Sequence, residues 1–224
     1  MAYNQDGRAV AGNAAVENAN KAFRSCVVPR SSRNFSIGAT TGTIGAALAA
    51  NSSVFAMRLD PGAGSVLVFI ERIRLQYTTI VAYTTPVTQG RRLSLFRGSG
   101  AAASGGTAIA AVAKKDSTSI DSEIEAAQGG DARISTTGAL TVTGITYEAL
   151  PFAEVSLSHV GAAGAFVEQV WEFTANENAP VVLQPGQLIA IRNPVVMDAA
   201  GTWSLTVSVD WHEALAYSST SADT

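Results

Sequence analysis

The most regular pattern of hydrophobic and polar residues in the chain lies between residues 201 and 213. Large apolar side chains alternate there with small polar ones, as Trp203, Leu205, Val207, Val209 and Trp211 against Thr202, Ser204, Thr206, Ser208 and Asp210. Successive side chains of a β-strand point to opposite faces, so this period of two predicts a strand with one buried face. The two tryptophans require a second layer to cover them.

Similar segments recur along the chain. Residues 54–59 and 66–80 are candidate strands, and Asp60, Pro61 and Gly62 between them provide turn chemistry. In the second strand, apolar Ile73, Leu75 and Tyr77 alternate with Arg72, Arg74 and Gln76. Its continuous apolar start, residues 66–70, predicts burial on both faces. Further candidate strands are residues 92–97, 107–113, 139–143, 154–158, 167–173 and 188–192.

These candidate strands are short and are separated by clusters of Gly, Pro, Ser or Asn, with a turn near residues 119–128. Residues 183–187 predict a type II turn centred on Pro185 and Gly186. The pattern predicts an all-β fold, an antiparallel β-sandwich or jelly roll, over residues 36–217. Residues 38–50 are small and are interpreted as a loop and edge segment, and residues 218–224 as a disordered C-terminal tail.

Residues 1–35 differ in composition from the rest. They are rich in Asn and Ala, and five positive against two negative side chains give them a net charge of +3, which leaves −6 for the remainder of a chain of −3. Such a segment cannot form a core alone, so it predicts an extended N-terminal arm that lies on a neighbouring subunit or stays disordered by itself. Its alanines also favour a short helix over about residues 12–23.

Composition narrows the classes of function. Charged residues are 15% of the 224, which disfavours generic binding to nucleic acid or to an anionic membrane. A surface of mostly Ser, Thr, Asn, Gln, Gly and Ala favours a chain packed among neighbours. Cys26 is the single cysteine, so no intrachain disulfide is expected. Neither a signal peptide nor a stretch of the roughly 18 apolar residues needed to span a bilayer is found, so export and membrane spanning are not expected.

Metal chemistry has little support in the sequence. His159 and His212 are far apart and outside any zinc motif, and His212 is interpreted as a partly exposed strand-end residue. Asp121, Glu123 and Glu125 alternate and could present carboxylates to Ca²⁺. Calcium sites usually combine more oxygen ligands with a glycine turn, so a solvated acidic loop is the favoured interpretation.

Patterns of nucleophilic catalysis are also lacking, because neither Gly-x-Ser-x-Gly nor a Cys beside a His occurs. Residues 98–106 are glycine-rich but lack the Gly-Lys-Ser/Thr of a phosphate-binding loop, so they are interpreted as a flexible inter-strand loop. A glycosidase would need two apposed carboxylates. The candidates on or near strands are Glu148, Glu154, Glu168 and Glu172, of which the last two share strand parity and are interpreted as an exposed rim.

Two further groups have a binding and a structural interpretation. The tryptophans could stack on sugars, but their alternation with polar residues favours core packing; they are Trp171, Trp203 and Trp211. Five arginines could form a basic stripe, and we favour ion pairs or hydrogen bonds between subunits over nucleic-acid recognition; they are Arg72, Arg74, Arg91, Arg92 and Arg97. The sequence thus predicts no catalytic, cofactor-binding or metal-binding residue.

Two segments resemble virion proteins of tailed bacteriophages. In residues 55–75 an Asp-Pro-Gly turn precedes a strand with an Ile-Glu-Arg-Ile pattern, which is similar to the early strand-turn-strand of these proteins. Residues 183–193, which contain Leu-Gln-Pro-Gly-Gln, and residues 201–213 are similar to their closing pair of strands. The resemblance covers roughly a quarter of the chain.

The resemblance implies a non-enzymatic structural protein of the virion, assembled in the host cytoplasm. We expect a capsid decoration or cement protein, or a head-fibre, neck or tail accessory protein, without a cofactor. It implies a homo-oligomer, with a trimer favoured, whose arms reach major capsid or tail subunits. The lack of a heptad shaft or collagen repeat departs from long fibres. The alternative is a receptor- or glycan-binding module of a phage tail or head fibre, using residues 98–106 or 161–164; a cell-wall hydrolase using Glu168 or Glu172 is a third reading.

Overall fold

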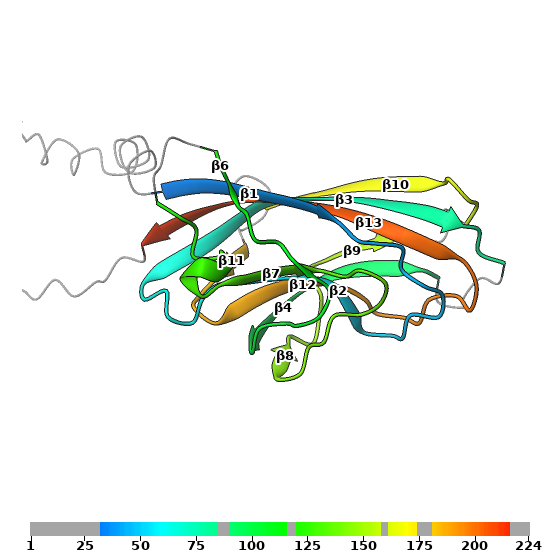
Figure 1. Cartoon of the computed structure of the whole chain (residues 1–224), viewed down its shortest axis with the longest axis horizontal. Coiled ribbons are helices and arrows are strands. Elements are labelled where there is room, and N and C mark those ends of the chain that lie inside the picture. The colour runs from blue at the N-terminus through cyan, green and yellow to red at the C-terminus, as the bar shows by residue number, and fades with distance from the viewer. Residues whose placement is uncertain (1–31, 85–89, 116–119, 158–160, 174–180, 216–224) are drawn as a thin grey trace, which may run out of the picture. The chain divides into compact units, whose positions relative to one another are not determined.

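The structure is a computed structural model that describes residues 32–84, 90–115, 120–157, 161–173 and 181–215. Two antiparallel sheets pack face to face in it, so the predicted all-β sandwich is confirmed (Figure 1). Residues 1–31 of the predicted arm, its short helix and the predicted tail 218–224 lie outside the described residues. None of the described residues form a helix with the length and hydrophobicity that crossing a bilayer requires.

The first sheet has the strand order β10-β3-β13-β1-β6, and β11 also pairs with β3. Its strands are β1 (Ser32–Thr40), β3 (Val66–Val81), β6 (Ala113–Lys114), β10 (Phe166–Glu172), β11 (Val181–Leu183) and β13 (Thr202–Leu215). The second sheet has the order β5-β7-β2-β12-β4-β8, and β9 also pairs with β4. Its strands are β2 (Ser52–Arg58), β4 (Arg92–Gly100), β5 (Thr107–Ala108), β7 (Asp131–Ile134), β8 (Ile145–Tyr147), β9 (Ala153–Ser156) and β12 (Gln187–Asn193).

The core lies between the sheets, and β13 supplies its centre. The five inward side chains predicted from the period of two are at most 1% exposed. Trp203 stacks on Tyr77 of β3 with ring centroids 5.1 Å apart, and Trp211 lies 5.8 Å from Phe35 of β1. The second layer that the tryptophans require is therefore provided by the opposite sheet together with neighbouring aromatic side chains.

A β-bulge divides β3 into two halves. Asp210 of β13 pairs with Arg72, but Trp211 pairs with Ile70, so Glu71 is an extra residue on β3. An extra residue reverses the inward and outward positions beyond it. For this reason burial on even numbers up to Ile70 changes to burial on odd numbers from Ile73.

The predicted two-sided burial of residues 66–70 is wrong. Val66, Val68 and Ile70 are buried, whereas Leu67 and Phe69 on the outer face are only partly so. Phe69 is instead covered by His212, whose ring stacks on it at 4.8 Å. No other strand of the described residues forms a further layer over this face of the first sheet.

The second sheet, in contrast, carries an additional layer on its outer face. The side chains packed there form a second apolar cluster of Ala56, Ala103, Leu140, Leu188 and Ala190. Segments 101–106 and 138–147 supply this cover, and Figure 1 shows β8 below the lower sheet. The interpretation of residues 98–106 as a flexible loop is therefore wrong: residues 98–100 belong to β4, and Ser104 forms a β-bridge with Thr141.

Most predicted strands are confirmed, with shifts of a few residues at their ends. Residues 107–113 are an exception, because only their ends form strands, β5 in the second sheet and β6 in the first. Residues 139–143 form no strand and only the bridge at Thr141. Four observed strands lacked a prediction, namely β1, β7, β8 and β11. The first of these begins at Ser32, before the expected start of the sandwich at residue 36, and it includes residues 38–40 of the expected loop.

Both predicted turns are present. The backbone N–H of Ala63 donates to the carbonyl of Asp60, which closes a turn around Pro61 and Gly62. The N–H of Gln187 donates to the carbonyl of Gln184 at 2.9 Å, and Gly186 has φ 80°. A positive φ at the third position is the requirement of a type II turn. Residues 126–128 form one turn of 3₁₀ helix within the predicted turn region.

Candidate functional site

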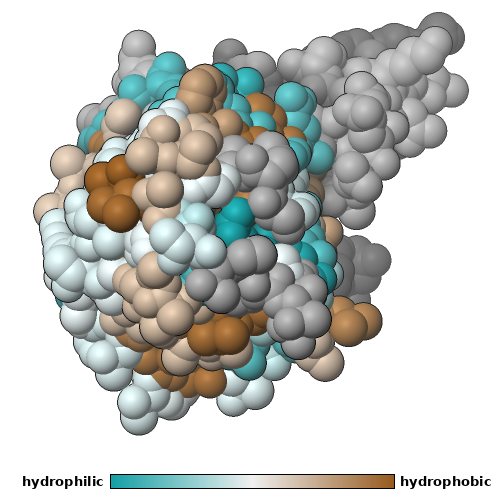
Figure 2. Space-filling model, turned by 90° about the vertical axis from the view of Figure 1, so that its right-hand side faces the viewer, coloured by the Kyte–Doolittle hydropathy of each residue, from teal (hydrophilic) through white to brown (hydrophobic). Residues whose placement is uncertain are grey.

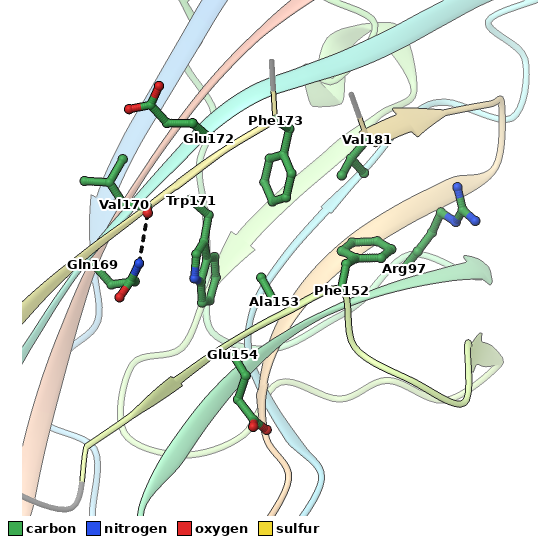
Figure 3. Close-up of a pocket in the computed structure, with 10 residues that line it drawn as sticks. All are labelled: Arg97, Phe152, Ala153, Glu154, Gln169, Val170, Trp171, Glu172, Phe173 and Val181. Atoms are coloured by element: carbon green, nitrogen blue, oxygen red, sulfur yellow. Dashed lines mark hydrogen bonds between the residues drawn. The ribbon is translucent and has the colours of Figure 1, made fainter. Parts of the chain in front are cut away.

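A groove of about 660 Å³ lies between the two sheets. We call it the edge groove, because β10 and β11 of the first sheet form one wall and β4 and β9 of the second sheet form the other (Figure 3). Its lining consists of Arg97, Phe152, Ala153, Glu154, Gln169, Val170, Trp171, Glu172, Phe173 and Val181. The sequence predicted no site here.

The alternation of side chains along β10 determines which of them face the groove. On β10, Trp171 points inward between the sheets, while Val170 and Glu172 point outward (Figure 3). Trp171 and Phe173 are 7% and 8% exposed, so the groove reaches down to the core. Phe152, which immediately precedes β9, covers the opposite wall and is 37% exposed. The interior of the groove is therefore apolar and largely aromatic.

Two of the three charged side chains at the rim of the groove, Glu154 and Arg97, are paired with other residues. Glu154 accepts hydrogen bonds from Ser94 at 2.8 Å and from Arg92 at 3.3 Å. Arg97 donates to Glu148 at 2.8 Å, and its guanidinium carbon lies 5.9 Å from the centre of the Phe152 ring. With two of its three rim charges paired and an aromatic interior, the groove suits an apolar side chain better than a polar substrate.

The four candidate carboxylates do not converge. Glu154 and Glu172 line the same groove, but Figure 3 shows them on opposite walls with their side chains directed away from each other. Glu148 is bound to Arg97 on the second sheet, and Glu168 is exposed on the outer face of β10. The arrangement does not provide the apposed pair that glycoside hydrolysis uses.

The tryptophans and arginines are placed by the core and by ion pairs. All three tryptophans are buried, so they offer no exposed platform for sugars. The five arginines form no single stripe, and four are paired within the chain: Arg72 with Asp210, Arg91 with Asp198, Arg92 with Glu154 and Arg97 with Glu148. The expected pairing of these arginines between subunits stays a prediction, and Arg74 is exposed on the outer face of β3.

A row of opposite charges crosses the outer face of the first sheet. Arg72 and Lys115 contact Asp210 with N–O distances of 2.5 and 2.7 Å. Burial opposes ionisation of Asp210, but hydrogen bonds and charge attraction from these two cations outweigh it and lower its pKa. Glu172 lies at the end of this row, in register with Arg72.

The predicted acidic loop packs around another carboxylate. Asp121 binds Lys114, and the backbone N–H of Glu123 donates to the fully buried Glu213. Glu213 also accepts from Ser122 and from Trp211, and it lies 3.7 Å from Arg33. Burial and the charge of Glu213 raise the pKa of Glu123. Within the described ranges, no three His, Cys, Asp or Glu side chains converge to hold a metal ion.

His212 is a strand residue with a partly exposed side chain, as interpreted from the sequence, and its Nδ1 lies 3.8 Å from Glu71. His159 falls outside the described residues. The loop at residues 161–164 is tied to the sandwich, since Gly161 accepts from the N–H of Tyr83 and Gly164 donates to Thr79. It therefore forms part of the packed end of the sandwich.

A buried polar cluster lies at that end. Arg91 donates to Asp198 at 2.5 Å and covers the ring of Tyr83, whose hydroxyl is 2.5 Å from that of Tyr77. Burial raises the pKa of Tyr83 to about 12. Burial and the neighbouring Tyr83 also raise the pKa of Tyr77. Asp198 and Tyr83 both lie outside the strands, where no hydrophobic pattern shows that a side chain is buried. This cluster therefore could not be predicted from the sequence.

Comparison with known proteins adds no family assignment. No model of a known protein family matches the sequence. A search of curated proteins found none with significant similarity.

Proposed function

We propose that the chain is a non-enzymatic structural component of a bacteriophage particle, a capsid decoration or cement protein that binds neighbouring subunits. The observation that carries the proposal is the position of the segments that resemble virion proteins. Residues 55–75 contribute to β2 and β3, and residues 183–193 and 201–213 form β12 and β13. β2 pairs with β12 and β3 pairs with β13, so the resemblance covers the central strands of both sheets.

The pairing of strands supports the jelly-roll form of the sandwich. Early strands pair with late ones, as β1 with β13, β2 with β12, β3 with β10 and β4 with β9. This is the pairing expected when one long antiparallel ribbon wraps so that its halves contribute to both sheets, as in the double-sheet jelly rolls of capsid proteins.

The surface supports assembly as the mechanism. Arg72 and Arg97 are paired with acids of the same chain, and Figure 2 shows hydrophobic residues in separate groups among pale residues of intermediate hydropathy. Contacts between such surfaces gain on the order of 25 cal/mol per Å² of buried apolar area. An interface of roughly 1,600 Å² therefore holds subunits together without ion pairs. The role is mechanical, and we favour a trimer.

Size-exclusion chromatography with light scattering tests self-association. A trimer has a mass of about 69 kDa, three times the 23.1 kDa of one chain. Immunolabelling of native particles by electron microscopy then tests the virion role, with labelled particles expected. A solitary monomer that turns over a substrate would overturn the proposal. Saturable binding of the isolated protein to host envelopes, with no label on particles, would favour the glycan-binding alternative.

A further inference from the structure

The edge strands on the two sides of the sandwich differ in length. On one side the edge strands β5 and β6 have two residues each, and residues 109–112 carry the chain from the second sheet to the first between them. Lys114 on this edge is held by Asp121. Short, charged edges discourage pairing with another chain. On the opposite side the edge of the first sheet is β10, which has seven residues.

The edge of β10 has the properties of an open template. Among the described strands, only β3 pairs with it. Val170 and Phe166 on its outer face are 44% and 58% exposed. The carbonyl of Val170 accepts a hydrogen bond from the side chain of Gln169 at 2.9 Å, a local substitute for a strand partner (Figure 3). An added strand can replace that bond and gain backbone hydrogen bonds along the edge.

We propose that residues 22–28 of a second copy of this chain add to the β10 edge as a further strand, an inference that rests on the assembly function proposed above. This segment is the part of residues 1–31 where bulky apolar residues cluster, as Phe23, Val27 and Val28. Pro29 follows and ends the run of backbone donors.

The period of two fits both faces of the edge. Phe23, Ser25 and Val27 share one face of an extended chain, and the two larger ones suit the aromatic edge groove. The other face presents Arg24, Cys26 and Val28 beside the outer face of β10.

Charge supports the same arrangement. Residues 21–30 carry Lys21, Arg24 and Arg30 and no acidic side chain. On the outer face of β10, Glu168 and Glu172 are exposed, and within the described part of the chain neither forms an ion pair. Arg72, the cross-strand neighbour of Glu172, is turned to Asp210. Opposite charges on adjacent strands stabilise the pairing.

The segment of the same copy does not reach this register. Arg33 contacts Glu213, which pairs with Val68, and Val68 also pairs with Leu183 of β11. Arg33 is thus level with β11, and a strand added outside β10 lies four strand spacings away, roughly 19 Å. Five residues from Arg33 to residue 28 span at most roughly 17 Å. Because β10 begins further along the sheet, the true separation is larger, so the segment comes from a neighbour.

Cysteine cross-linking tests the contact, because Cys26 is the only cysteine of the chain. Cys26 is two residues from Arg24, and Val170 is two residues from both Glu168 and Glu172. Pairing Arg24 with Glu168 in a parallel strand, or with Glu172 in an antiparallel strand, therefore places Cys26 opposite Val170. We would oxidise full-length Val170→Cys and locate the bond by mass spectrometry. The expected product is a covalent dimer or larger ladder through residues 26 and 170, which is lost in Cys26→Ser.

Ser208→Cys is the matched control, since Ser208 lies in the same cross-strand row as Val170 but two strands away from the edge. We expect it to form no cross-link. Charge reversal by Glu168→Lys with Glu172→Lys in the Val170→Cys chain should also abolish the bond, while circular dichroism stays unchanged.

Each result distinguishes the placement of the segment from the assembly function. A bond between residues 26 and 170 of one chain would overturn the exchange between copies. An oligomer by light scattering without any bond at residue 170 would overturn the docking at β10 but leave the assembly function standing. A monomer at all concentrations would overturn both.

Discussion

The buried pair of Arg91 and Asp198 provides the most quantitative test of the fold. Their side chains are 4% and 0% exposed and are joined at 2.5 Å, and the guanidinium covers Tyr83. Asp198→Asn keeps the size of the side chain but removes its charge, so the Arg91 cation stays in a buried site without this carboxylate. Breaking a buried pair in this way costs about 3–5 kcal/mol.

Urea unfolding followed by tryptophan fluorescence measures this loss. With a slope near the upper end for small proteins, about 3 kcal/mol per M, the midpoint should fall by roughly 1 to 1.7 M. Glu148→Gln is the matched control, because its pair with Arg97 is 45% and 34% exposed, and it should cost less than about 1 kcal/mol. Replacing Arg91 and Asp198 together by Met and Leu should recover most of the loss. Equal effects of Asp198→Asn and Glu148→Gln would refute the argument, since burial would then make no difference.

Three further predictions concern the backbone and the titrating groups. Gly106 has φ 58°, and a Cβ added there would collide with the carbonyl of Ile134. We therefore expect Gly106→Ala to lower the thermal midpoint of unfolding. Gly138 has open space around it, so Gly138→Ala should leave the midpoint unchanged. Asp210 has a lowered pKa in the fold, so Asp210→Asn should destabilise at pH 7, and the difference in unfolding free energy should shrink as pH falls below about 4. The pKa of Tyr83 is raised to about 12 in the fold, whereas a tyrosine of the unfolded chain ionises near pH 10. Tyrosinate absorbance should therefore show that Tyr83 ionises at a higher pH in the folded protein. The free energy of unfolding should decrease as the pH rises from about 10 to about 12.

Strands with a strict period of two could be predicted from the sequence, and strands without it could not. β13 and the second half of β3 alternate clearly, and both are where the sequence placed them. β7 follows two glycines and contains Asp131 and Arg133, and β11 has three residues, so neither provides enough length for a pattern. Each of these strands is stabilised by pairing with strands that are distant in the sequence. Such pairing produces no hydrophobic pattern within the strand itself.

The apolar segment 139–143 shows why β-propensity misled. Leu140 is buried and Val142 partly buried, as a strand would require, but they pack onto the outer face of the second sheet and cover Ala56 and Leu188. The sequence therefore indicated burial correctly and assigned it to the wrong layer. The edge groove had no signal either, because Trp171, Phe152 and Val181 meet there only once the two sheets are aligned.

The intrachain pairing of the arginines limits the ways in which copies of this chain would associate in the proposed assembly. A surface arginine left free would make association depend on charge and would be screened at a Debye length of about 8 Å in physiological salt. Here Arg72, Arg92 and Arg97 are bound by acids of their own chain, so these three arginines are not available to attract the acids of a second sandwich. In the assembly that we propose, association depends on apolar area and on open backbone groups, and the edge of β10 beside the groove combines the two. In the docking that we propose, the basic residues near Arg24 and the acidic side chains of β10 select which segment docks, while apolar contact supplies the affinity.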